Sequence, residues 1–419
     1  MEKKYKVLVL SDHALSTSGV GCQTRFLLEG LIKKGRWSFR QFGAAIKHAN
    51  YEPVEVNPDF IIKPIDGFGN RNLIMQAIVA EKPDALFIFT DPRFFTWLYE
   101  MEDEVRSVCP IVYWHVWDNY PFPEYNRPIY ESTDLINCHS HLTYTMVGEH
   151  FPKKTNFIPH SLPEDLFYPL PDDEIMAYKK EILGDDAADK FVLFWVNRNA
   201  RRKRPNDVLL SFKMFLDRLE KEGKDRSSAI LLMHTDPTDN EGPNLLETAK
   251  LLDLKENIVF SNQRVDFDKM NVLHNISDAC INLSYAEGFG LATLEAMNCA
   301  KPIIATKTGG LTRQVVDHRD NSENGFGLDV KTKTLVGSQS VPYIYEDYAD
   351  NGDAAKAIYD LYTMKKEERI KLGQKARQYA LSEFSYQKTI DEWDKTMLKT
   401  IKDYKHSPRK TWEVKEITS

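Results

Sequence analysis

The chain has 419 residues and a formal net charge of -7. This length is too great for one compact core and favours two domains of about 180–200 residues each. The acidic charge argues against a general nucleic-acid or anionic-membrane binder, although a local basic patch is compatible with it.

The five cysteines are scattered and lack the spacing of a metal site. No apolar run approaches the ~18 residues of a membrane span, and the first apolar run is too short for a signal peptide. We therefore expect a soluble, cytoplasmic protein with reduced cysteines and no stable membrane insertion.

From residue 6 to about residue 158, apolar runs alternate with helical stretches, which predicts a doubly wound parallel sheet. The expected strands are Lys6–Ser11, Ser38–Phe42, Ala85–Thr90, Ile111–Trp114, Leu135–Cys138 and Asn156–Ile158. The proline-rich segment 159–173 cannot form a continuous helix. We expect the domain boundary there, with an N-terminal domain in residues 1–170.

A second alternating series predicts another sheet of the same type in residues 171–385. Its expected strands are Phe191–Val196, Ile230–Met233, Ile258–Phe260, Ala279–Leu283 and Ile303–Thr306. We interpret Lys331–Ser340 as a solvated loop, and the pattern after residue 349 predicts helices only.

Two carboxylates, Glu287 and Glu295, flank a glycine-containing turn that follows a predicted strand and begins a helix. Gly288 and Gly290 allow the backbone to turn sharply, so that free N–H groups at Phe289–Leu291 attract a phosphate. Glu287 could then bind the hydroxyls of one sugar and Glu295 those of a second. The alternative is that both acids only complement the positive helix start.

A basic run, residues 198–204, follows the strand Phe191–Val196 and precedes a helix that begins near Pro205. Arginine offers a bidentate fork and lysine a compact charge, and together they suit a diphosphate. A solvated basic loop is the other reading, but the position at the carboxyl end of a strand favours ligand binding.

Two further candidates follow strands of the first sheet. Gly19 and Gly21 form a small-residue loop before a helix, which permits close approach of a sugar or phosphate or is an ordinary turn. His115 follows the strand Ile111–Trp114, where it could bind a sugar hydroxyl or pack among aromatic side chains.

Glu287 and Glu295 have the E-x7-E spacing, and the segment around them resembles that of the family-4-type retaining glycosyltransferases. The resemblance extends along nearly the whole chain. It implies a GT-B fold, in which two Rossmann-like domains face a cleft and a C-terminal helix, within residues 386–419, crosses back to the first domain.

The same resemblance implies roles for individual residues. Arg198 and Lys203 match the R-x4-K phosphate pair, and Val265 lies where the base is expected. Gly19 and Gly21 match the glycine loop over the donor, and His115 matches a histidine of the first domain. The sequence departs from the family pattern at three places. Asp118 is displaced from the usual position next to the histidine. His160 and Ser161 replace Asn and Gly in the interdomain hinge, and Arg313 replaces an acid.

We therefore predict a retaining hexosyl or pentosyl transferase that uses a nucleotide-diphosphate sugar and no metal or cofactor. The acceptor hydroxyl could belong to a saccharide, a small molecule or a hydroxymethylated DNA base. A nucleotide-sugar epimerase and a non-catalytic sugar-nucleotide-binding protein are the alternatives. We expect Glu287→Ala and Lys203→Ala to abolish transfer and to leave the fold intact.

Overall fold

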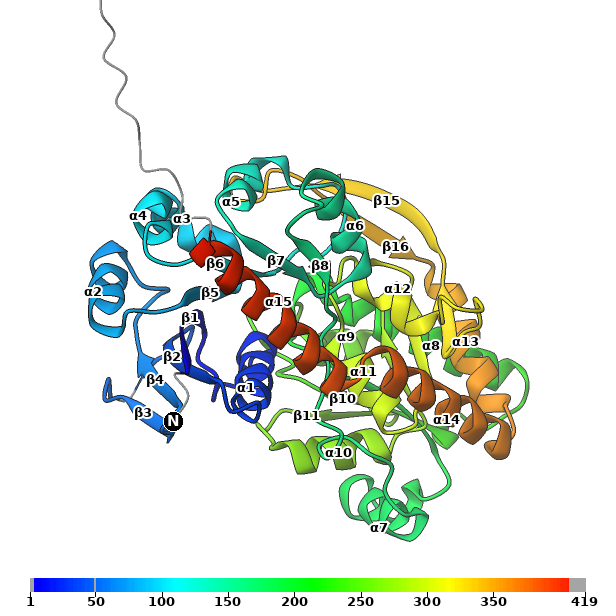
Figure 1. Ribbon diagram of the computed structural model, residues 1–419. Helices are drawn as coiled ribbons and strands as arrows, with labels where there is room; N and C mark the ends of the chain where they lie inside the picture. Colours follow the sequence, from blue (N-terminus) through cyan, green and yellow to red (C-terminus); the bar gives the residue numbers. More distant parts are fainter. Residues whose placement is uncertain (1–3, 49, 407–419) are drawn as a thin grey trace, which may run out of the picture. The chain divides into compact units, whose positions relative to one another are not determined.

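The computed structural model describes residues 4–48 and 50–406 and divides into two compact units (Figure 1). Unit 1 comprises the described residues within Met1–Trp117, Phe122–His160 and Gln387–Ser419. Unit 2 comprises Asp118–Pro121 and Ser161–Tyr386.

Unit 1 is built on an eight-stranded sheet with the order β3-β4-β2-β1-β5-β6-β7-β8, which is parallel except at the antiparallel pair β3 and β4. The strand order reverses between β1 and β5, as expected of a doubly wound sheet. The strands are β1 (Tyr5–Asp12), β2 (Trp37–Ala44), β3 (Val54–Asn57), β4 (Phe60–Pro64), β5 (Ala85–Phe89), β6 (Ile111–His115), β7 (Leu135–Cys138) and β8 (Thr155–Phe157).

Helices connect these strands and bury the apolar faces of the sheet. They are α1 (Gly19–Ile32), α2 (Arg71–Glu81), α3 (Thr96–Tyr99), α4 (Glu102–Arg106), α5 (Arg127–Glu131) and α6 (His141–His150). Leu8, Leu10, Leu86 and Ile88 are among the side chains that form the unit's core.

The last helix, α15 (Tyr386–His406, red in Figure 1), packs against the sheet of unit 1. The Trp393 ring is fully buried, and its centroid lies 5.4 Å from that of Phe87 and 5.0 Å from that of Trp114. The indole of Trp37 donates a 2.7 Å hydrogen bond to Asp394. These contacts confirm that the C-terminal helix crosses back to the first domain.

Unit 2 has a six-stranded, wholly parallel sheet with the order β11-β10-β9-β12-β13-β14. Its strand order reverses between β9 and β12, so both units have the topology of Rossmann-like domains. The strands are β9 (Phe191–Val196), β10 (Ala229–His234), β11 (Ile258–Ser261), β12 (Ala279–Asn282), β13 (Ile303–Thr306) and β14 (Gly325–Leu328).

The helices of unit 2 cover this sheet and complete its core. They are α7 (Asp172–Leu183), α8 (Pro205–Lys221), α9 (Leu245–Leu251), α10 (Phe267–Asn275), α11 (Leu291–Asn298), α12 (Gly309–Val315), α13 (Asn351–Thr363) and α14 (Lys366–Glu383).

A two-stranded hairpin replaces the solvated loop expected at Lys331–Ser340. Strand β15 (Val330–Val336) pairs antiparallel with β16 (Ile344–Ala349). Most of β15 is exposed, which explains its polar sequence, whereas β16 buries Glu346 and Asp347.

The short segment Asp118–Pro121 belongs to unit 2 although it follows β6 of unit 1. The amide of Asn119 donates a 2.8 Å hydrogen bond to Asp347, and the backbone of Tyr345 donates one of the same length to the carbonyl of Tyr120.

Candidate functional site

The reversal of strand order in unit 2 brings together two loops that are far apart in the sequence. The loop after β9 carries Lys203, and the loop after β12 carries Glu287. Their side chains form a buried ion pair, and each residue is only 8% exposed. Carboxyl ends of strands at such a reversal are where ligands bind in open α/β sheets.

A second cation and a hydroxyl complete the surroundings of Glu287. The guanidinium of Arg202 lies 3.7 Å from the Glu287 carboxylate and 3.8 Å from that of Asp118. The hydroxyl of Ser284 donates to Glu287 at 3.3 Å. Two cations and two carboxylates are thus gathered in one partly buried cluster.

The charges in this cluster shift the pKa values of Glu287 and Lys203. Burial alone would raise the pKa of Glu287, but Lys203 and Arg202 outweigh it and hold that pKa below its ordinary value. Burial and the neighbouring Arg202 lower the pKa of Lys203. Glu287 is therefore an ionised acceptor at neutral pH.

The turn after Glu287 is held by its own backbone and by α12. Gly290 has a φ of +93°, a conformation that glycine adopts without strain. The amide of Gln314 donates to the carbonyls of Phe289 and Gly290 at 2.7 and 3.0 Å, and the N–H of Gly310 donates to the carbonyl of Glu287 at 2.9 Å.

Helix α11 begins directly after this turn, and no side chain caps its N-terminus. Its first N–H groups, at Leu291 and beyond, are a potential anion site because the helix start carries partial positive charge. Gly288 and Phe289 precede it in the turn. This turn and helix start follow Glu287, the partner of Lys203; binding of a phosphate there stays a prediction.

Glu295 lies in the second turn of α11 and accepts from a residue that the sequence did not point to. The Nε2 atom of His274 is 3.1 Å from the Glu295 carboxylate, and His274 is fully buried beside the ring of Phe194. The sequence contains no spacing that would link these two residues, since they come from different helices.

Arg198 and Lys203 do not share a partner. The Arg198 guanidinium is largely exposed and forms a 2.8 Å ion pair with Asp239, whereas Lys203 is bonded to Glu287. Asp239 lies in the loop after β10, which the sequence did not single out.

The remaining arginines of the basic run also face acids. Arg201 pairs with Glu346, Arg204 pairs with Asp207 at 2.9 Å, and both guanidinium groups stack on the Tyr285 ring. The run is therefore a set of matched ion pairs rather than an open basic patch.

Arg313, which stands where the family pattern has an acid, forms a 2.7 Å ion pair with Glu383 at the end of α14. Its charge is thus balanced within unit 2. Val265 lies half-buried in the loop before α10.

The candidates in unit 1 lie in two different environments. Gly19 and Gly21 lie in the first turn of α1 and not in a loop before the helix, as the sequence had indicated. A Cβ atom on Gly21 would lie 2.2 Å from the Ser16 hydroxyl, so this turn is closely packed against the segment after β1. His115 is the last residue of β6 and is completely buried, with its Nε2 atom 3.0 Å from the Tyr130 hydroxyl.

The position of His115 differs from the sequence expectation in the length of the strand, and its surroundings match the packing alternative. The strand extends one residue further than expected, and both faces of this strand are buried, so the imidazole lies in the core of unit 1. Burial lowers the pKa of His115 to about 3. The ring is a neutral packing group here, and in this conformation it presents no surface to a substrate.

Within residues 4–48 and 50–406, no group of three or more His, Cys, Asp or Glu side chains is arranged to hold a metal ion. In the same part of the chain, no helix is both long and apolar enough to cross a bilayer. Metal independence stays a prediction.

Comparison with curated proteins gives partial matches. N-acetyl-alpha-D-glucosaminyl L-malate synthase of Bacillus anthracis is 26% identical over 195 residues, which is 46% of each chain. D-inositol 3-phosphate glycosyltransferase of an Arthrobacter strain is 29% identical over 170 residues, covering 41% of this chain and 38% of the relative. The matched segments span less than half of either relative.

Solved structures match over almost the whole chain. HepE of Anabaena, solved with UDP and glucose, has a TM-score of 0.69 at 16% identity and covers 94% of this chain and 100% of its own. Sucrose-phosphate synthase of Thermosynechococcus elongatus has a TM-score of 0.67 at 17% identity, covering 96% of this chain and 99% of its own. At these identities the likeness concerns the fold.

The family described as "Glycosyl transferases group 1" matches residues 180–379, the segment that contains Lys203, Glu287 and Glu295. Residues 180–379 thus form a group 1 glycosyl transferase domain, and the chain that contains it has the GT-B fold.

Proposed function

We propose that this protein transfers a sugar from a nucleotide-diphosphate donor to the hydroxyl of a small molecule or saccharide, with retention of the anomeric configuration. The observation that carries the proposal is the Lys203–Glu287 pair at the strand-order reversal, directly beside the uncapped start of α11. The proposal is supported because a cation and a carboxylate precede a helix start whose N–H groups attract anions.

In this proposal the donor diphosphate lies at the start of α11. Lysine has three N–H donors, so Lys203 can keep Glu287 and also bind a phosphate oxygen. Arg198 would turn from Asp239 to the diphosphate, which its exposure permits. Glu287 would accept hydrogen bonds from the sugar, and Glu295 from the ribose, held in place by His274.

The chemical step is the exchange of one bond at the anomeric carbon. The bond to the phosphate oxygen breaks, and a bond to the acceptor oxygen forms on the same face. The departing phosphate takes the acceptor's proton, so no nucleophile from the protein is needed. Lys203, Arg198 and the N–H groups of α11 would stabilise the charge that grows on the diphosphate.

The first donors and acceptors to test come from the relatives. HepE was solved with UDP and UDP-glucose, and the curated relatives are named for L-malate and D-inositol 3-phosphate. A DNA acceptor is not part of the proposal, because the basic run that favoured it is engaged in ion pairs.

The test measures release of nucleoside diphosphate from a panel of UDP-, GDP- and ADP-sugars, with and without these acceptors, and reads the product anomer by NMR. We expect release only when an acceptor is present, and a retained anomer. Glu287→Gln should lower the rate about 100-fold or more. Glu220→Gln, an exposed glutamate of α8, is the matched control and should keep the rate.

Other outcomes would separate the alternatives. Conversion of the donor sugar at C2 without an acceptor would indicate an epimerase. Donor binding without any turnover would indicate a binding protein, and an inverted anomer would contradict retention.

A further inference from the structure

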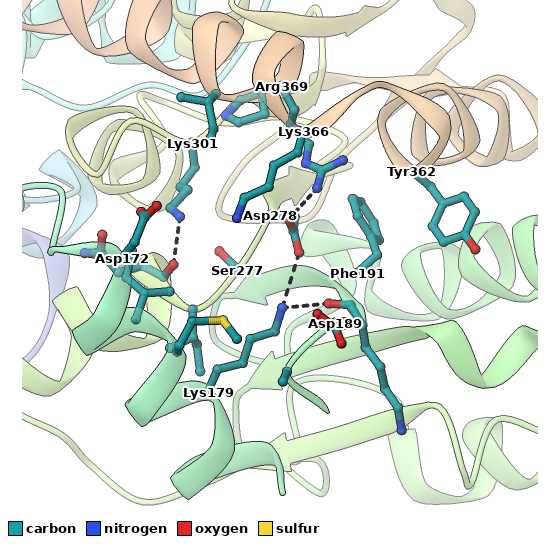
Figure 2. A pocket seen from close by; sticks show the side chains of 18 of the residues that line it. Asp172, Lys179, Asp189, Phe191, Ser277, Asp278, Lys301, Tyr362, Lys366 and Arg369 are labelled. Atoms are coloured by element: carbon teal, nitrogen blue, oxygen red, sulfur yellow. Dashed lines mark hydrogen bonds and ion pairs between the residues drawn. The ribbon is translucent and has the colours of Figure 1, made fainter. Parts of the chain in front are cut away.

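A cavity lies in unit 2 at the amino ends of the strands, whereas the Lys203–Glu287 pair lies beyond their carboxyl ends. Figure 2 shows this cavity from close by. Its lining includes Phe191, the first residue of β9, and Asp278 and Pro302, which precede β12 and β13. Helices α7 and α14 supply the other walls. We call it the α7–α14 cavity; its volume of about 470 Å³ is in the range of small-ligand pockets.

Cationic side chains from three elements converge on this cavity. Figure 2 shows the head groups of Lys179 from α7, Lys301 from the loop before β13, and Lys366 and Arg369 from the start of α14 directed toward it. The N-terminal end of α14 adds partial positive charge at the same place.

These cations have few carboxylates to balance them. Asp278 accepts from Arg369 at 2.9 Å and lies 3.8 Å from the Lys179 ammonium, and it also accepts the N–H of Val192. Lys301 donates to a neutral group, the carbonyl of Asn275, at 2.7 Å.

The whole lining has an excess of positive charge. Five cationic side chains face three acidic ones: Lys179, Lys190, Lys301, Lys366 and Arg369 against Asp172, Asp189 and Asp278. Asp172 and Asp189 are exposed, and Lys190 is paired with Asp186 outside the lining. The inner part of the cavity therefore holds the buried Lys179 and the half-buried Lys301 and Arg369 around one carboxylate.

Buried ammonium groups are costly without a matching anion. Burial lowers the pKa of Lys179 against the opposing effect of Asp278, and burial likewise lowers the pKa of Lys301, with Lys179 among the cations that add to this. An anion between them would reduce the mutual repulsion and would raise both pKa values.

We propose that the α7–α14 cavity binds a small phosphate-bearing anion, with Lys179, Lys301, Lys366 and Arg369 as its ligands. The site lies at the amino ends of the strands and is separate from the donor site proposed above, which lies at their carboxyl ends. The bound anion would accept hydrogen bonds from α7, from the loop before β13 and from α14, and so would hold these elements together.

The test is a calorimetric titration of the full chain with inorganic phosphate at low ionic strength. We expect binding that weakens at least tenfold in Lys301→Gln and in Lys366→Gln. Lys366 is exposed, so that variant should fold even if removal of the half-buried Lys301 charge disturbs the unit. Lys356→Gln removes an exposed cation of α13 outside the cavity and should bind as the wild type does.

Arg198→Gln distinguishes this cavity from the donor site, since it alters the loop after β9 and should leave phosphate binding in the cavity unchanged. Loss of binding in Arg198→Gln would assign the phosphate to the donor site and overturn the proposal. Absence of binding at millimolar phosphate, or equal affinity in wild type, Lys301→Gln and Lys366→Gln, would overturn it as well.

Discussion

At the scale of single residues, the pairing of Lys203 with Glu287 changes what a substitution should do. Both side chains are buried, so removal of one partner leaves the other charge in the interior of unit 2 without its nearest counter-charge. Such a loss costs about 3–5 kcal/mol. The expectation that Glu287→Ala and Lys203→Ala leave the fold intact is therefore revised: each should affect stability as well as transfer.

We predict that Lys203→Met lowers the free energy of unfolding by about 3–5 kcal/mol, and that Lys203→Met with Glu287→Gln recovers most of it because no charge is then buried. Urea denaturation of the wild type, both single variants and the double variant measures this coupling. Losses that simply add in the double variant would show that the two side chains do not interact.

The buried histidine of unit 1 predicts a dependence of stability on pH. Burial lowers the folded-state pKa of His115 to about 3, whereas in the unfolded chain it titrates near its ordinary value of 6.5. As pH falls below 6.5, the unfolded state takes up a proton that the folded state does not, so folding becomes less favourable down to about pH 3.

Between pH 7 and pH 5, protonation of His115 in the unfolded chain should lower the free energy of unfolding by about 2 kcal/mol. His115→Gln keeps a polar group near Tyr130 but cannot titrate, so its unfolding free energy should fall less over this interval than that of the wild type. Denaturant unfolding followed at both pH values measures the difference. Equal pH dependence in the two proteins would contradict a neutral His115 in the native state.

At the scale of elements, the start of α11 depends on one glycine. Gly290 adopts a φ of +93°, and a Cβ atom there would lie 2.4 Å from the Leu311 side chain and 2.9 Å from the Thr293 hydroxyl. For a residue with a Cβ, the left-handed conformation alone is about 1–2 kcal/mol less favourable, and the close contacts raise this energy further.

We therefore expect Gly290→Ala to lower the unfolding temperature of unit 2 and to weaken binding of a nucleotide sugar, because the turn that presents the first N–H groups of α11 must shift. Gly148→Ala is the control: Gly148 lies in α6, where a Cβ would approach nothing closer than 3.9 Å, so helix propensity should leave stability unchanged or raise it. Differential scanning calorimetry and calorimetric titration with UDP-glucose check both effects. Matching behaviour of the two variants would contradict this account.

The elements themselves could be predicted where burial dictates the pattern. Strands β5, β7 and β12 are buried along their whole length, β9 is buried except at Val196, and their largely apolar runs indicated them correctly. Four strands lack this signal. β3 and β15 are exposed, β16 places acids inside, and β14 contains two glycines, so none has the apolar periodicity of a core strand.

At the scale of the whole molecule, the alternation of strands and helices predicted the two parallel sheets, and the resemblance to a known family implied the GT-B fold. The structure adds that the loops after β9 and β12 meet. The partners within the site could not be predicted the same way. Asp239 and His274 come from other loops and helices, and the burial of His115 depends on helices that cover both faces of β6. Such contacts arise from tertiary packing, which local sequence patterns do not encode.

The return of α15 to unit 1 has a consequence for biosynthesis. The fully buried Trp393 lies beside Phe87 and Trp114, yet on the ribosome it is translated after the whole of Ser161–Tyr386 of unit 2. Unit 1 therefore completes its packing only after that segment of unit 2 has been made. Until α15 is synthesised, the rings of Phe87 and Trp114 lack their contact with Trp393.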